Sequence, residues 1–224
     1  MVSQLNRSLK RALGLATALV IAGFGVSANA RIHRDPGQTA IPQVTVQQIE
    51  AGKTFGIKTA PIRIDTYTDF ECPHCQDLYE TVLEPLINDY VSSGKVYLVD
   101  HDFPLPMHPY AKIAAYYADA AAAIGRFPQV QQALFIHQAQ WAATGKIEPI
   151  VAAVLSPAKA KEVEELEKSP VVHAAVQHDV EQGQALGIDE TPTMYITHGG
   201  HRTPIIGVVS YPILRGYLDA LLRQ

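Results

Sequence analysis

Cysteine is scarce in this sequence. Cys72 and Cys75 carry the only thiols among 224 residues, so any thiol chemistry must occur at this one place. A protein that relied on disulfides for stability would spread several pairs over long loops. This pair spans a loop of four residues, and closing so short a loop removes little entropy from the unfolded chain. The composition therefore favours redox chemistry over a structural disulfide.

A second cysteine pair, which a zinc site built from cysteine ligands alone would need, is also absent. Nine histidines could supply ligands instead, but they show no spacing typical of a metal site. We expect no metal and no organic cofactor beyond the cysteine pair itself.

Long apolar runs are few. The one clear example, residues 12–26, follows three basic residues and precedes the small tripeptide Ala28-Asn29-Ala30. This pattern is typical of a secretory signal peptide with its cleavage site. An uncleaved anchor fits less well, because 15 apolar residues are fewer than the roughly 20 that span a bilayer. We expect residues 1–30 to be removed and the protein to be periplasmic or otherwise extracytoplasmic.

Positive charge is also in short supply. Removing residues 1–30 removes three of 18 basic and none of 22 acidic residues, which leaves a net charge of −7. That balance argues against nucleic acid and anionic membrane surfaces as partners. The remaining length suits one domain with a large insertion, and we expect a monomer.

Residues 61–103 have the pattern of a βαβ unit. Residues 61–68 are apolar and β-rich, and residues 73–92 have helical spacing, with a kink expected at Pro85 because proline removes a backbone hydrogen bond. Residues 95–103 read as a second strand. This order implies a right-handed crossover and a parallel strand pair.

The segments on either side complete the domain organisation. Residues 31–60 are rich in glycine and proline and predict a loose N-terminal arm, with an edge strand at Val44-Thr45-Val46. Residues 107–187 are helical in pattern, and their charged run at 159–168 fits a solvated helix face. Two strands and a helix follow, at 193–197, 203–209 and 213–222. The sequence thus predicts a thioredoxin-like α/β fold over residues 61–224, a central mixed sheet flanked by helices, with an all-helical insertion of about 80 residues.

The cysteines lie at the turn from strand to helix. The free N–H groups and the dipole of a helix N-terminus stabilise a thiolate, here on Cys72. Cys75 lies one turn inside the helix and suits the role of resolving thiol. Pro73 is tolerated in a first turn, and His74 stabilises the thiolate further if its ring is protonated or donates a hydrogen bond. A passive, exposed His74 is the alternative.

Three stretches together resemble the DsbA family of thiol:disulfide oxidoreductases. They are the active-site stretch Thr68-Asp69-Phe70-Glu71-Cys72-Pro73-His74-Cys75, the junction Phe103-Pro104-Leu105 with His108-Pro109, and the loop Thr191-Pro192-Thr193, which is similar to the cis-proline loop of thioredoxin-fold proteins. The similarity extends from about residue 60 to the C-terminus, in the right order and spacing.

The resemblance implies a function and its partners. Cys72 would be the nucleophile that passes a disulfide to reduced or unfolded secreted proteins, and a quinone-linked membrane partner of the DsbB or VKOR-like kind would re-oxidise the pair. It also implies a cis Pro192 and pairing of the Thr191 backbone with an extended substrate peptide. An ordinary turn at Thr191-Pro192 is the alternative.

One position departs from the family pattern. Many members carry a buried acid six residues before the first cysteine, where this chain has Thr66. Asp65 points to the opposite face of the strand, and Asp69 lies near the turn. The group that handles the proton is therefore left open.

Other interpretations remain. A disulfide isomerase or reductase is one, since threonine before Pro192 occurs in isomerase-type relatives. Those enzymes, however, usually carry an N-terminal dimerisation domain, and the reductases of cytochrome maturation usually have tryptophan where this chain has Glu71. A peptide-binding chaperone with incidental cysteines is another.

Four other side chains invite a functional interpretation that we do not favour. We expect His108 to be a cap or a packed residue, His198 and His201 to be exposed turn residues, and Trp141 to belong to the core.

Overall fold

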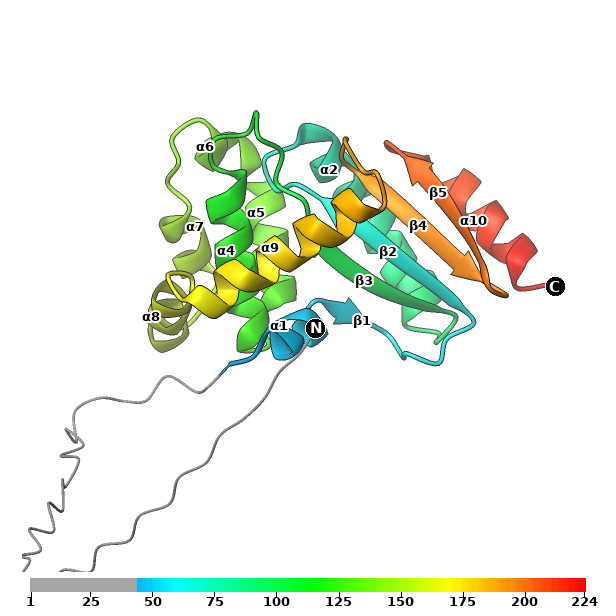
Figure 1. Ribbon diagram of the computed structural model, residues 1–224, viewed down its shortest axis with the longest axis horizontal. Coiled ribbons are helices and arrows are strands. Elements are labelled where there is room, and N and C mark those ends of the chain that lie inside the picture. The colour runs from blue at the N-terminus through cyan, green and yellow to red at the C-terminus, as the bar shows by residue number, and fades with distance from the viewer. Residues whose placement is uncertain (1–43) are drawn as a thin grey trace, which may run out of the picture. The chain divides into compact units, whose positions relative to one another are not determined.

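The computed structural model describes residues 44–224, so the expected signal peptide and residues 31–43 of the arm lie outside the described residues. Its centre is a five-stranded sheet of order β1-β3-β2-β4-β5 (Figure 1). The strands are β1 (Thr54–Phe55), β2 (Ile62–Thr68), β3 (Val96–Asp102), β4 (Thr193–His198) and β5 (His201–Ile206). β2 and β3 are parallel and the other pairs are antiparallel, which confirms the mixed sheet and the predicted parallel pair.

The crossover is one long helical segment with altered hydrogen bonding around Pro85. It consists of α2 (Pro73–Leu78), η1 (Tyr79–Leu83), α3 (Glu84–Leu86) and η2 (Ile87–Val91), where the two η segments are π-helical. Proline cannot donate to the carbonyl one turn earlier. In the π-helical segments each hydrogen bond instead joins groups five residues apart; for example, the Glu84 N–H donates to the Tyr79 carbonyl.

Between β3 and β4 the chain is helical, which confirms the predicted insertion. Its helices are α4 (Ala111–Ala123), α5 (Phe127–Ile136), α6 (Gln138–Ala142), α7 (Glu148–Ala153), α8 (Pro157–Leu166) and α9 (Pro170–Ala185). Figure 1 shows α4 to α8 grouped beside the sheet, with α9 crossing in front of β2 and β3. The closing helix α10 (Tyr211–Leu221) packs against α3. Within residues 44–224 no helix has the length and hydrophobicity to cross a membrane.

Trp141 is fully buried in the insertion and donates its indole N–H to the Leu134 carbonyl at 2.7 Å, as expected of a core residue. The main core runs from the insertion to the sheet and includes both cysteines. At the far end of the sheet His198 and His201 flank the turn Gly199-Gly200, where both glycines have positive φ.

The start of the described chain differs from the expectation. Val44-Thr45-Val46 is not a strand, because Thr45 caps α1 (Val46–Gly52). Its hydroxyl accepts the Gln48 N–H at 3.2 Å while the Gln48 side chain accepts the Thr45 N–H at 2.9 Å, a reciprocal capping box. The edge strand is β1 instead, which pairs with β3.

Candidate functional site

Cys72 is the N-cap of α2 and has an extended backbone, so its carbonyl accepts the first N–H groups of the helix, from Cys75 at 3.0 Å and Gln76 at 3.2 Å. Both cysteines carry free thiols in this structure. Cys72 is 5% exposed and Cys75 is fully buried. Cys72 is thus the more accessible of the two, as expected, although it is more enclosed than a freely exposed nucleophile.

The two thiols have opposite acidities. A hydrogen bond from the Cys75 thiol lowers the pKa of Cys72 to about 5; burial opposes this, and the Thr191 hydroxyl and the N–H groups of Cys75 and His74 assist it. Burial raises the pKa of Cys75 well above its ordinary value, and the negative charge on Cys72 adds to this effect. At neutral pH the site therefore holds one thiolate, on Cys72, and one thiol, on Cys75.

The residues between the cysteines contribute through the backbone. Pro73 occupies the first position of α2, where a missing N–H leaves no acceptor unpaired. The His74 side chain is 74% exposed, with its Nδ1 3.7 Å from a carboxylate oxygen of Asp77. The contact of His74 with the Cys72 sulfur is made by its N–H group. Stabilisation of the thiolate by the imidazole itself stays a prediction.

The Thr191–Pro192 peptide bond is cis, and the loop lies against the cysteines. The Cys72 sulfur is 3.5 Å from the Thr191 carbonyl oxygen, to which the thiol form donates. The Pro192 carbonyl accepts the Gly207 N–H at 2.8 Å, which joins the loop to the end of β5. The Thr191 hydroxyl is buried beside the cysteines, where it helps to lower the pKa of Cys72.

The helical insertion holds the active-site turn through contacts that the sequence did not reveal. Gln138 at the start of α6 donates its side-chain N–H groups to the carbonyls of Phe70, at 2.7 Å, and Cys72, at 3.0 Å. The Glu71 carboxylate accepts the Tyr110 N–H at 2.7 Å. These partners are 39 to 68 residues apart, and no local motif marks them.

The junction before α4 is tied to the same turn by Asp69. Its buried carboxylate accepts N–H groups of Glu71, at 2.7 Å, and Leu105, at 2.8 Å, and lies 2.7 Å from Nδ1 of His108. The backbone N–H of Asp69 points at the Cys75 sulfur, 3.4 Å away. His108 is thus a packed residue, as expected, but its partner belongs to the active-site turn.

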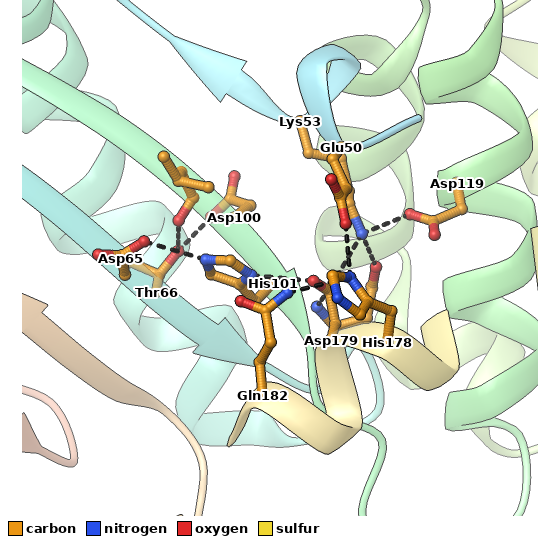
Figure 2. Close-up of polar contacts among 12 residues, drawn as sticks. Glu50, Lys53, Asp65, Thr66, Asp100, His101, Asp119, His178, Asp179 and Gln182 are labelled. Atoms are coloured by element: carbon orange, nitrogen blue, oxygen red, sulfur yellow. Dashed lines mark hydrogen bonds and ion pairs between the residues drawn. The ribbon is translucent and has the colours of Figure 1, made fainter. Parts of the chain in front are cut away.

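The buried position occupied by Thr66 has an acid beside it on the next strand. Thr66 is opposite Asp100 in the β2–β3 register and donates its hydroxyl to the Asp100 carboxylate (Figure 2). Gln131 donates to the other oxygen at 2.9 Å, and burial raises the pKa of Asp100. Asp65 faces away, as predicted, and binds Arg63 and His101. A buried acid is therefore present near this position, supplied by β3.

Comparison with known proteins agrees with this geometry. A thioredoxin family model matches residues 48–205. The probable disulfide bond formation protein D of Bacillus anthracis is 23% identical over 193 residues, which cover 83% of this chain and 86% of that protein. The Na(+)/H(+) antiporter NhaA 1 of Mycolicibacterium gilvum is 31% identical over 150 residues, 66% of this chain and 24% of the antiporter. The chain thus spans about a quarter of the length of this and a second NhaA relative.

Solved structures show the same architecture. Alpha-DsbA1 of Wolbachia pipientis superposes with a TM-score of 0.62 at 17% identity, covering 75% of this chain and 89% of that one. DsbA2 of Pseudomonas aeruginosa gives 0.59 at 24% identity, with 76% and 93% covered. Because the family model matches well over half of the chain and the insertion is shared with these structures, the chain belongs to the thioredoxin family and has the DsbA form of its fold.

Proposed function

We propose that this protein is an exported thiol:disulfide oxidoreductase that donates a Cys72–Cys75 disulfide to reduced proteins. The observation that carries the proposal is the opposite acidity of the two thiols, with the pKa of Cys72 lowered to about 5 and that of Cys75 raised. A stabilised thiolate makes the reduced dithiol favourable relative to the disulfide. The disulfide is then a strong oxidant and passes readily to other thiols.

The reaction proceeds in two exchanges. A substrate thiolate attacks the Cys72 sulfur, and the bond between Cys72 and Cys75 breaks with its electron pair on Cys75, which takes up a proton because its pKa is high. The second substrate thiolate then attacks the substrate sulfur of the mixed disulfide, and Cys72 leaves as a thiolate. The substrate loses two electrons and two thiol protons; one proton remains on Cys75 and the other enters the solvent.

The surroundings of Cys72 suit an unfolded polypeptide. The Thr191 backbone beside the sulfur is the expected partner for an extended substrate strand. Exposed apolar side chains flank the site. Met107, which precedes His108, is 75% exposed, and Ile206, which precedes Gly207, is 62% exposed. Apolar side chains that a folded protein would bury can contact these residues.

Export and re-oxidation complete the proposed cycle. The signal-peptide pattern of residues 1–30 would deliver the protein to an oxidising compartment. A quinone-linked membrane partner of the DsbB or VKOR-like kind would take two electrons from the dithiol and restore the disulfide. No other cofactor is needed for this exchange, and we expect the protein to act as a monomer.

Cys72→Ser tests the mechanism. The variant should fail to accelerate oxidative refolding of a reduced protein, because the attacked sulfur is gone. Cys75→Ser is the matched control; it keeps the Cys72 thiolate and should accumulate a mixed disulfide with an activated substrate thiol. Refolding by Cys72→Ser at the rate of the unchanged protein contradicts the mechanism.

A redox titration against glutathione separates the oxidase from an isomerase or reductase, because a strongly reducing potential is incompatible with the oxidase.

The alternative of a peptide-binding chaperone is tested by measuring the aggregation of an unfolded protein in the presence of the variant that lacks both thiols. If that variant suppresses aggregation fully and the unchanged protein shows no dithiol cycling, the chaperone function replaces the proposed oxidase.

A further inference from the structure

The pair of Asp69 and His108 joins the active-site turn to the junction before α4. Nδ1 of His108 lies 2.7 Å from Oδ2 of Asp69, and the ring remains 20% exposed while the Asp69 carboxylate is fully enclosed. Burial disfavours a charged imidazole, but the hydrogen bond and the negative charge of Asp69 outweigh it and raise the pKa of His108. The contact therefore favours the charged form of His108 opposite the Asp69 carboxylate.

Asp69 does not need His108 to satisfy its hydrogen bonds. One carboxylate oxygen already accepts the Glu71 N–H and the other accepts the Leu105 N–H. The backbone of Asp69 is fixed as well, since its carbonyl accepts the Cys72 N–H at 3.1 Å and its N–H donates to the Cys75 sulfur. What His108 adds to this arrangement is positive charge.

That charge lies where the site would otherwise be strongly negative. Asp69 and Glu71 precede Cys72, and a thiolate on Cys72 makes a third anion within one turn of chain. The negative charges of Asp69, Glu71 and the Cys72 thiolate each raise the pKa of His108 and so favour its imidazolium form. Because an interaction between two charges is mutual, the imidazolium stabilises the Cys72 thiolate by as much as the thiolate stabilises the imidazolium. A buried Asp69 carboxylate without its counter-ion would instead oppose ionisation of Cys72.

We propose that His108 is a positioning residue of the thiol exchange, whose imidazolium, held by Asp69, neutralises the active-site turn and stabilises the Cys72 thiolate. The inference rests on the proposed function, because it concerns the thiolate that drives the exchange. It assigns to His108, 36 residues beyond Cys72 in sequence, the electrostatic role that the sequence suggested for His74. The His74 ring points instead toward Asp77 and solvent.

Two variants separate charge from structure. His108→Asn keeps a donor near the position of Nδ1 and removes the charge; His108→Lys keeps the charge. His201→Asn, at the exposed start of β5, is the matched control. We expect His108→Asn to lower the thiolate fraction of Cys72, followed by its ultraviolet absorbance, on the order of threefold to tenfold at acidic pH. The protein should become a weaker oxidant of glutathione by a similar factor, and His108→Lys should recover most of the loss.

The unchanged protein provides a second test that needs no substitution. Coupling is reciprocal, so the pKa of His108 measured by NMR should be higher in the reduced protein than in the oxidised one. Identical values in the two redox states, or a His108→Asn variant whose Cys72 titrates as in the unchanged protein, overturn the inference while the proposed function stands. If Cys72 of the unchanged protein itself titrates like a free cysteine, the proposed function fails and this inference with it.

Discussion

At the scale of single residues, position alone makes two identical side chains chemically different. Cys72 caps a helix and keeps a small exposed area, whereas Cys75 is one turn further in and completely enclosed. The hydrogen bond from the Cys75 thiol, assisted by the N-terminal N–H groups, stabilises negative charge on the first sulfur, and burial disfavours it on the second. The difference in pKa, rather than the presence of two thiols, gives the exchange its direction.

The same difference predicts how redox state changes stability. The pKa of Cys72 is about 5 in the folded protein, whereas that of an ordinary thiol is 9.0. Ionisation of Cys72 therefore stabilises the reduced, folded protein, and this stabilisation grows as the pH rises from 5 to 9. At pH 7 this contributes about 3 kcal/mol. The oxidised protein has no thiolate and gains little from its short disulfide loop. The reduced form should therefore be the more stable one at pH 7.

Urea unfolding of both redox forms at pH 7 and pH 5 measures this difference. We expect the advantage of the reduced form to fall to a small fraction of its value at pH 5, where the thiolate is half protonated. In Cys72→Ser this contribution should be absent. An advantage that stays constant between the two pH values contradicts the assigned pKa.

At the scale of elements, α1 is packed against the insertion through a backbone contact. A Cβ placed on Gly52, the last residue of α1, would lie 2.4 Å from the carbonyl oxygen of Ala122 in α4. Gly52→Ala should therefore destabilise the protein by about 1–3 kcal/mol, because backbone cannot move aside as a flexible side chain can. The measurement is the free energy of unfolding in urea.

Gly216 in α10 is the matched control. A Cβ there would meet no atom within 4 Å, and Gly216 is inside a helix. Gly216→Ala should stabilise the protein by about 0.5–1 kcal/mol through the higher helix propensity of alanine. If Gly52→Ala is as stable as the unchanged protein, or is stabilised like Gly216→Ala, the approach of α1 to α4 is not tight.

The elements that the sequence predicted are those with local signals. β2, β3, the long helix after Cys72 and the final hairpin follow hydrophobic periods and glycine positions, and their observed bounds are close to the expected ones. The arm does supply an edge strand, β1, but its placement at Val44-Thr45-Val46 was wrong. That tripeptide alternates like a strand, and the capping box of Thr45 with Gln48 outweighs the pattern. Contacts such as Asp69 with His108 or Gln138 with Cys72 join distant positions, and no local pattern records them.

At the scale of the molecule, a buried ionic network connects the start of the described chain with the sheet and the insertion. Lys53 is enclosed by three carboxylates, at 2.6 Å from Asp102, 2.7 Å from Asp119 and 2.5 Å from Asp179. Figure 2 shows Lys53 with Asp119 and Asp179. The charges of the three carboxylates outweigh the effect of burial and raise the pKa of Lys53, while burial raises the pKa of Asp119 within the same cluster. The cluster joins β3, α4 and α9 around one cation. Since a buried charge without its partner is costly, the whole arrangement must form together.

His101 continues this network toward β2 and gives the fold a dependence on pH. Its ring lies 2.9 Å from Asp179 and 3.1 Å from Asp65. Burial opposes its charge, but these carboxylates raise the pKa of His101 from 6.5 to about 9. Because the folded-state pKa is the higher one, the stabilisation is complete below pH 6.5 and is lost as the pH rises through 9. The loss is on the order of 3 kcal/mol.

This pH dependence can be measured without interference from the active site if His108, whose pKa is also raised, is replaced together with the thiols. In a Cys72→Ser, Cys75→Ser, His108→Asn background neither a thiol nor His108 titrates, and Asp65, with a pKa of about 2, stays ionised throughout. The free energy of unfolding should then fall between pH 6.5 and pH 9, with about one proton released on unfolding. His101→Gln in the same background should be less stable at pH 6.5 and should lose most of this slope. If the two proteins lose stability in parallel, His101 is neutral in the folded state and the network is held together by Lys53 alone.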